Sequence, residues 1–416
     1  MPTIHHETLA SGLQLVIEPM AGVKSLALSV LLPAGAAFEP EDQLGVCAVL
    51  TEMLNRGAGG LSAREHSDAL DQLGVQRDID NDSRHISLRA SMLADKAADA
   101  LPLLLDMIVR PNLDDAAFEP ARDLCVQSID SMLDEPQHRV SELLRLQHQP
   151  APYGRSSLGD RDCLLKLTNA DVRSFAQNTL RPGRAILSLA GDIDPARARA
   201  MLEKSLDGWA GVGPEWPEPT PAARGYMPVV SDGAQVHIAL AYDAPPEGDE
   251  RSVLQHTAAA VLSGGMSGRL FTEVREKRGL CYAVVARYAG QRNWGTVTGY
   301  AGTTPERAQE TLDVFTGELR RLSEGVDESE FERAIVGMKS RLVMQGESSG
   351  ARAAAIASDV AILDQPRSLD ELTQRVDSVT LDALNHYVKA NPPGDITLVT
   401  LGPEALTPAP GSTPGS

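Results

Sequence analysis

Histidines and carboxylates are the residues of this 416-residue chain best suited to bind a metal ion. Glu65 precedes His66, and His85 follows closely after Asp80 and Asp82. A zinc site needs three or four such ligands converging on one point, and two histidines on one helix face bind zinc when they are four residues apart. Neither histidine has another histidine at that spacing. We therefore interpret His66 and His85 as solvated surface side chains, and we predict no metal site in this chain.

Cysteines and a pair of glycines offer two other kinds of chemistry. The chain has four cysteines: Cys47, Cys125, Cys163 and Cys281. They show no Cys-x-x-Cys spacing, which favours buried, reduced thiols. Gly264-Gly265 could begin a phosphate-binding loop, but no Lys-Ser or Lys-Thr follows it. The pair therefore predicts a tight turn.

The stretch from Gly45 to Gly57 is predicted to form an amphipathic helix that ends at a glycine. Its apolar residues recur at helical spacing: Val46, Val49, Leu50, Met53 and Leu54. Ala48, Thr51 and Glu52 stand between them.

The rest of the first half is predicted to place strands before and after this helix, then helices and a final strand. We expect strands at 13–20, 25–32, 75–80, 85–92 and 184–190, and helices at 62–74, 94–109, 114–133, 139–148 and 168–179.

Residues 210–227 are rich in proline and glycine and predict a linker, after which the same order begins again. We expect strands at 236–242, 280–288, 294–301 and 395–401, and helices at 250–262 and 266–277 with three or four more before the last strand. The sequence thus predicts two α+β domains, 1–209 and 228–402. Residues 403–416 are rich in Pro, Gly and Ser and are predicted to be disordered.

Composition limits the possible partners and the setting. Hydrophobic residues make up 42% of the chain and charged residues 23%, as is usual for globular proteins. The net charge of −19 argues against binding to nucleic acid or to anionic membranes. The first residues lack the basic and apolar regions of a signal peptide, and no apolar run reaches the length of about 18 residues typical of a membrane helix. We predict a cytoplasmic protein.

Residues 262–285 combine a Gly-Gly turn, an Arg-Leu-Phe helix and a Gly-Leu-x-Tyr strand start, in that order. This stretch is similar to the consensus of the M16 (pitrilysin, or inverted-zincin) metallopeptidases, and in length the chain resembles the short-chain M16B type. The resemblance covers roughly residues 5–402. It implies two related domains, each an antiparallel sheet packed with helices, and a dimer that encloses a peptide chamber.

The family carries its zinc motif, His-x-x-Glu-His, on the helix that the stretch from Gly45 to Gly57 resembles. The resemblance aligns Ala48, Thr51 and Glu52 with the first histidine, the glutamate base and the second histidine. The family's glutamate ligand on a later helix falls at Ser128, next to Gln127. Alanine cannot bind zinc and threonine cannot serve as the base, so the resemblance implies a subunit without its own zinc.

The resemblance also assigns a role to Arg275 and Tyr282, which match the family's functional Arg/Tyr pair. Attack on a peptide carbonyl develops an oxyanion, which preorganised donors stabilise. A tyrosine hydroxyl with its usual pKa near 10 is a neutral donor at pH 7, and an arginine is a permanent planar cation. Catalysis in trans to a partner's zinc site is the role implied for both.

Three functions remain open. The first is the zinc-less subunit of a heteromeric M16B peptidase, inactive alone, which pairs with a zinc-bearing M16B chain that binds the zinc, and contributes to peptide hydrolysis. The second is a peptidase-derived binding or scaffold protein, which could also pair with itself. The third is a self-sufficient metallopeptidase with unusual ligands such as His66 or His85.

Overall fold

The structure is a computed structural model, and it describes residues 4–408. The chain forms two compact units, each built from three segments. Unit 1 includes residues up to 131 with 150–220 and 345–367, and unit 2 includes 132–149, 221–344 and 368 onward. Both units combine a sheet with helices, so the predicted α+β class with two related domains is confirmed.

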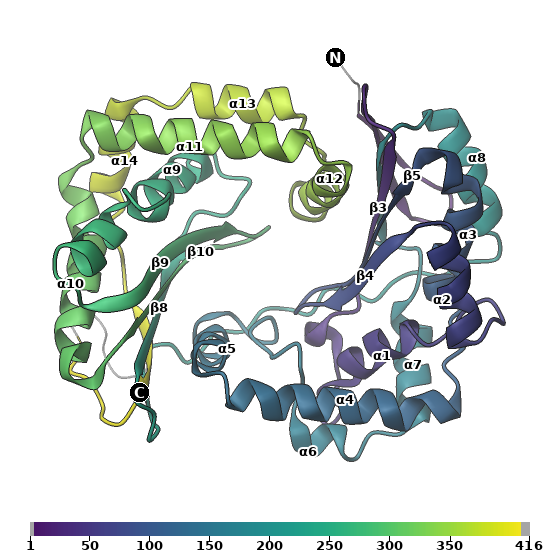
Figure 1. The fold of residues 1–416 in the computed structure, drawn as a ribbon, viewed down its shortest axis with the longest axis horizontal. Helices are drawn as coiled ribbons and strands as arrows, with labels where there is room; N and C mark the ends of the chain where they lie inside the picture. Colours follow the sequence, from purple (N-terminus) through teal and green to yellow (C-terminus); the bar gives the residue numbers. More distant parts are fainter. Residues whose placement is uncertain (1–3, 409–416) are drawn as a thin grey trace. The chain divides into compact units, whose positions relative to one another are not determined.

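Unit 1 contains a six-stranded sheet (Figure 1). Its order is β1 (His5–Thr8), β2 (Gln14–Pro19), β6 (Ile186–Gly191), β3 (Ser25–Leu32), β5 (Ile86–Leu93) and β4 (Gln76–Asn81). The pairs are antiparallel except β2 with β6, which is parallel. The sheet is therefore mixed, whereas the family resemblance implied an antiparallel one.

The helices of unit 1 from the first half of the chain are α1 (Val46–Leu54), α2 (Ala63–Gln72), α3 (Ala97–Val109), α4 (Asp115–Leu133), α6 (Arg161–Leu164), α7 (Asn169–Thr179) and α8 (Pro195–Ser205), with short 3₁₀ turns at Ala36–Phe38 and Ala94–Lys96. Side chains alternate across a strand. Leu15 and Ile17 of β2 accordingly join the core formed with these helices, whereas Val16 points to the opposite face.

That opposite face is covered by α12 (Ser349–Leu363), a helix from the second half of the chain (Figure 1). Its Ile356 and Val360 pack with Val16 and Ile186. Polar bonds add to this apolar contact. The Ser188 hydroxyl donates to the carbonyl of Ala353 at 2.7 Å, for example.

Unit 2 contains a five-stranded sheet in the order β7 (Tyr226–Val230), β11 (Thr397–Gly402), β8 (Val236–Ala244), β10 (Gly295–Thr303) and β9 (Cys281–Gly290). Only β7 and β11 pair in parallel. Its helices from the second half are α9 (Ser252–Ser263), a π-helical turn at Phe271–Glu276, α10 (Ala308–Arg321), α11 (Glu328–Gly346), α13 (Leu369–Asp377) and α14 (Leu381–Ala390), with 3₁₀ turns at Pro305–Arg307 and Leu322–Glu324. Counting α12, five α-helices separate β10 from β11, whereas the sequence predicted three or four.

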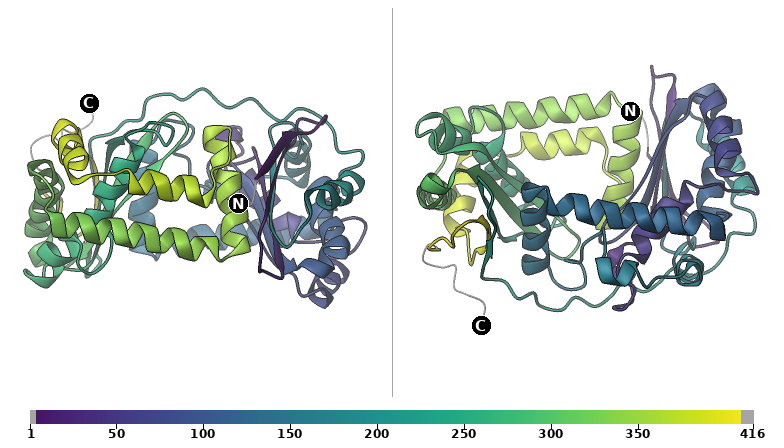
Figure 2. Two further views of the ribbon diagram at one scale, coloured as in Figure 1. Left: turned by 90° about the horizontal axis from the view of Figure 1, so that it is seen from above. Right: turned by 60° about the horizontal axis from the view of Figure 1, so that its bottom comes forward.

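The other face of this second sheet is covered by α5 (Pro136–His148), which comes from the first half of the chain. Val140 and Leu144 of α5 pack with Ala239 and Val399. Each unit therefore receives one helix from the other half, and the boundaries 1–209 and 228–402 differ from the units in these segments. The chain passes from one unit to the other within the last turn of α4 and again within the last turn of α11. Both long helices are seen in Figure 2, α4 in blue and α11 in green.

The ends of the predicted domains also differ in detail from the sequence prediction. Most of the predicted linker 210–227 belongs to unit 1: the rings of Trp216 and Phe38 lie 5.1 Å apart, and Thr220 pairs with Ala151. Part of the predicted disordered tail is held by hydrogen bonds to side chains, since the N–H of Leu406 donates to the Tyr226 hydroxyl and that of Thr407 donates to the Gln309 side-chain oxygen. Residues 409–416 of that predicted tail lie outside the described residues.

No helix within residues 4–408 combines the length and the apolar character needed to cross a bilayer.

Candidate functional site

Helix α1 carries the positions that the resemblance aligns with the zinc motif. Its N-cap is Gly45, at φ +104°, which has no side chain to bond the first free N–H groups. The carboxyl group of Glu39 does so instead: its Oε1 accepts from the N–H of Gly45 at 3.0 Å and from that of Cys47 at 2.8 Å. Glu39 could not be predicted from the sequence, because nothing in a linear pattern links it to the start of this helix.

Ala48 and Thr51 are buried on α1, with 7% and 5% of their surfaces exposed. The Thr51 hydroxyl donates to the carbonyl of Cys47 at 2.9 Å, so it serves the helix itself. Glu52 is only partly buried. Burial, and to a lesser extent the negative charge of Glu52, raises the pKa of Cys125 on α4 to about 12, which keeps that thiol protonated.

Helix α4 carries the aligned position of the family's glutamate ligand. Its buried face includes Cys125 and Ile129, whereas Gln127 and Ser128 are exposed. The Ser128 hydroxyl donates to the carbonyl of Leu124 one turn earlier, at 3.0 Å. The Ser128 side chain thus bonds the backbone of its own helix, and it has no carboxylate with which to bind a metal ion.

His66 is not the surface residue that the sequence predicted. It is buried, with 1% of its surface exposed, and its Nε2 lies 3.0 Å from the carbonyl oxygen of Leu103. His66 lies on the apolar face of an amphipathic helix, α2, which turns it inward against α3.

His85 is partly buried, and its ring lies edge-on to Trp216 with the centroids 5.5 Å apart. Burial lowers the pKa of His85 to about 4, although the charge of Asp82 opposes this shift. His85 is therefore neutral at pH 7. Across residues 4–408 no three His, Cys, Asp or Glu side chains lie close enough together to hold a metal ion.

Arg275 and Tyr282 lie on neighbouring elements of unit 2. Arg275 is exposed on the π-helical turn, and its guanidinium stacks over the Phe271 ring at 5.0 Å. Tyr282 lies near the start of β9, one of the two edge strands of the sheet, with 66% of its surface exposed. Among the described residues no hydrogen bond joins the two side chains, and neither is committed to another polar side chain. Both therefore face solvent as free donors.

Two family models match the chain. One, described as "Insulinase (Peptidase family M16)", matches residues 15–160, and the other, "Peptidase M16 inactive domain", matches residues 166–338. The chain belongs to peptidase family M16. Arg275 and Tyr282 lie within the residues that the second model matches.

Relatives of similar length bear the name zinc protease. "Uncharacterized zinc protease YmxG" of Bacillus subtilis is 25% identical over 420 aligned residues, which cover 98% of this chain and all of the relative. An "uncharacterized zinc protease" of Streptomyces coelicolor is 27% identical, over 91% of this chain and 85% of its own.

Solved structures share the fold across the whole chain. A peptidase M16 inactive domain from Pseudomonas fluorescens superposes with a TM-score of 0.88 at 19% identity, covering 98% of this chain and 100% of that one. A protease from Helicobacter pylori gives 0.87 at 19% identity, covering 97% and 100%. A chain of complex III from Candida albicans gives 0.81 at 18% identity, covering 96% of each chain.

Proposed function

We propose that this M16 protein is the zinc-less subunit of a heteromeric M16B peptidase. A companion chain provides His-x-x-Glu-His and binds the zinc, and this chain completes the peptide chamber. The observation that carries the proposal is that Ala48, Thr51, Glu52 and Ser128 stand at the positions on α1 and α4 that the resemblance aligns with the zinc motif, while Arg275 and Tyr282 match the family's Arg/Tyr pair.

The geometry of unit 2 supports a role for the retained pair. A free guanidinium can hold a peptide carbonyl or carboxylate in its planar fork, and a neutral phenol can donate to a developing oxyanion. Tyr282 lies on β9, whose outer edge has no neighbouring strand in the sheet. A peptide that adds to this edge as a further strand would be fixed through its backbone, which leaves the choice of sequence broad.

The decisive experiment measures zinc content and peptide hydrolysis of the purified chain, alone and mixed with a zinc-bearing M16B chain that co-purifies with it. We expect no stoichiometric zinc and no hydrolysis for the chain alone, and hydrolysis well above that of either chain after mixing. Zinc and hydrolysis in the isolated chain would overturn the proposal. An unchanged rate on mixing would also count against it.

Arg275→Ala and Tyr282→Phe test the retained pair within the assembled complex. Losing one oxyanion donor costs on the order of 10²-fold in kcat, and we expect a loss approaching this size for Tyr282→Phe. Arg275→Ala should chiefly raise KM, because it removes a group that holds the peptide. Size-exclusion chromatography should show that both variants still assemble.

Arg197→Ala, an exposed arginine on α8, serves as the matched control and should leave the rate unchanged. Wild-type kcat and KM in both test variants would remove Arg275 and Tyr282 from the mechanism.

A second candidate function is a peptidase-derived binding or scaffold protein, for which the alternative partner is a second copy of this chain in a homodimer. The likeness to a chain of complex III from Candida albicans supports it, because that chain has the same fold within that complex. Assembly without any hydrolysis in the mixing experiment would favour this function. The third function, a self-sufficient metallopeptidase, has less support because His66 is engaged with a backbone carbonyl in the core.

A further inference from the structure

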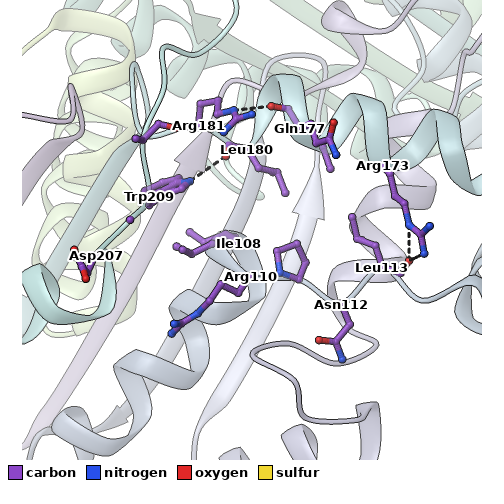
Figure 3. A pocket seen from close by; sticks show the side chains of 15 residues that line it. Ile108, Arg110, Asn112, Leu113, Arg173, Gln177, Leu180, Arg181, Asp207 and Trp209 are labelled. Atoms are coloured by element: carbon purple, nitrogen blue, oxygen red, sulfur yellow. Dashed lines mark hydrogen bonds between the residues drawn. The ribbon is translucent and has the colours of Figure 1, made fainter.

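A cavity of about 460 Å³ opens on unit 1 (Figure 3). Three segments line it: the end of α3 with the turn after it, the second half of α7 with Arg181, and the loop after α8. The lining residues that matter for binding are Ile108, Leu180 and Trp209, which are apolar, and Arg110, Arg173 and Arg181, which are basic. The volume lies in the range of about 300–1,000 Å³ that is typical of small-molecule sites.

The floor of the cavity is apolar and fixed. Ile108, Leu180 and Trp209 are almost fully buried, and all belong to the main core of unit 1. The Trp209 indole N–H donates to the carbonyl of Leu180 at 3.0 Å, which fixes the indole plane. An apolar group that enters would therefore meet a preformed surface.

The rim carries three arginines, Arg110, Arg173 and Arg181, and one acidic lining residue, Asp207. Two further carboxylates lie next to the lining, since Asp106 pairs with Arg110 and Asp115 lies 3.1 Å from Arg173. The rim therefore presents guanidinium groups to an anion, with carboxylates beside two of them.

Each guanidinium is anchored and keeps free N–H groups. Arg110 bonds Asp106 through Nε and Nη2, and Arg173 bonds the carbonyl of Leu113 through the same atoms. Arg181 donates from Nε to the carbonyl of Gln177 and from Nη1 to that of Ala210. Anchoring lowers the entropy lost when an anion binds, and the remaining N–H groups are available to it.

Of the three arginines, Arg181 has the least compensated charge. Arg110 is paired with Asp106, and Arg173 lies 3.1 Å from the carboxylate of Asp115. Within residues 4–408 Arg181 has carbonyl partners and no carboxylate partner. Arg181 is therefore the arginine that should contribute most to the binding free energy of an anion.

Leu113, in the cavity wall, has a φ of +50°, which is uncommon for a residue with a side chain. Its carbonyl accepts from Arg173 and also from the side chain of Asn169 at 3.2 Å. The side chains of Arg173 and Asn169 thus hold the peptide of Leu113 in this uncommon conformation. Strained positions of this kind cluster at ligand sites.

We propose that this cavity binds a small organic anion, with its apolar body on the floor formed by Ile108, Leu180 and Trp209 and its carboxylate or phosphate group at the arginine rim. The site is independent of Arg275 and Tyr282, which belong to unit 2, and of the proposed peptidase role.

Isothermal titration calorimetry of the full chain tests the proposal with four probes: phenyl phosphate, benzoate, the neutral analogue benzamide, and inorganic phosphate. We expect both aromatic anions to bind at millimolar concentration or below, and benzamide and inorganic phosphate to bind at least about tenfold more weakly. Tighter binding of phenyl phosphate would identify a phosphate head group, and tighter binding of benzoate would identify a carboxylate. Either result supports the site.

Two variants locate the binding. Arg181→Gln should weaken phenyl phosphate binding at least about tenfold. Gln177→Trp, at an exposed position on the rim, should block the cavity without disturbing the core. Arg197→Gln is the matched control and should bind as the wild type does. The proposal would be overturned if neither aromatic anion bound. It would also be overturned if folded Arg181→Gln and Gln177→Trp bound phenyl phosphate as tightly as the wild type does.

Discussion

Glu39 is a buried carboxyl group at the start of α1, and its ionisation is coupled to folding. Burial raises its pKa from 4.5 to about 7, although the bonds from Cys47 and Gly45 and the charge of Arg155 act in the opposite direction. Its Oε2 is buried without a hydrogen-bond partner among the described residues. Such a group holds its proton in the folded state over a pH range in which the unfolded chain has lost it.

Glu39→Gln should therefore change how stability depends on pH. With a raised pKa in the folded state, wild-type stability falls as the pH rises from about 4.5 to about 7, by a total of about 3 kcal/mol. Glutamine can accept the same two N–H bonds without ionising. We expect wild type and variant to have similar free energies of unfolding near pH 5, with the variant more stable at pH 8, as measured by urea unfolding.

The difference between the two pH curves isolates Glu39, because other titrating groups are common to both proteins. His148 is one of these groups: burial lowers its pKa to about 4, so it removes stability as the pH falls through the acid range. Glu41→Gln, at an exposed position nearby, is the control and should reproduce the wild-type curve. A Glu39→Gln curve parallel to that of the wild type would show that Glu39 is not the titrating group.

At the scale of elements, α12 is attached to its sheet by a buried ion pair. Arg352 is fully buried, and its Nη2 and Nε lie 2.7 and 2.9 Å from the Oε2 of Glu18 on β2. Its Nη2 also donates to the carbonyl of Arg367 at 3.1 Å. The pair therefore fixes the register of a helix that comes from a distant part of the chain.

Arg352→Met should destabilise unit 1 strongly. Removing one member of a buried pair leaves the other charge without a partner, which typically costs about 3–5 kcal/mol. The double variant Glu18→Gln/Arg352→Met should recover much of this loss, because no unpaired charge remains. Urea unfolding of both single variants and the double variant gives the coupling free energy.

Arg64→Met, which breaks the exposed pair with Asp68, is the control for loss of an arginine and should leave the unfolding midpoint nearly unchanged. A similarly small effect of Arg352→Met would mean that the buried pair does not hold α12 in place.

Element positions could be predicted from the sequence where apolar periodicity is local. The helix at Gly45–Gly57 and the strands at 25–32 and 85–92 are confirmed as α1, β3 and β5 within a few residues. Periodicity says which face of an element is apolar, but not which distant element covers it. The sequence therefore could not predict which sheet α5 and α12 would cover.

The candidate site was only partly predictable for the same reason. The resemblance located Arg275 and Tyr282 from one continuous stretch, and both are present and exposed, while their role stays a prediction. Burial of His66 could have been inferred from the apolar face of its helix. Arg110 comes from a different segment than Arg173 and Arg181, so no spacing in the sequence brings all three rim arginines together.

At the scale of the whole molecule, the exchange of α5 and α12 makes the two halves of the chain depend on each other. A fragment of residues 1–220 lacks α12, and one of residues 221–416 lacks α5. Each would expose an apolar sheet face that includes Val16 and Ile186 or Ala239 and Val399.

We expect each fragment expressed alone to aggregate or to lose cooperative unfolding, and the two fragments expressed together to form a complex. The intact chain cleaved after Thr220 once folded should remain associated, since each helix is already in place. Cooperative urea unfolding of either fragment alone would contradict this expectation. The measurements are circular dichroism during unfolding and size-exclusion chromatography.

The position of α12 also sets an order of events during synthesis. The last strand of the first sheet, β6, ends at Gly191, but the helix that covers its second face ends at Leu363. At about 5–20 residues per second, the ribosome needs roughly 10–35 s to make the residues between these points. During that interval all six strands of the first sheet have been synthesised, but one apolar face of the sheet is not yet covered by a helix. The time at which a chaperone would be most useful is thus fixed by where one helix is encoded.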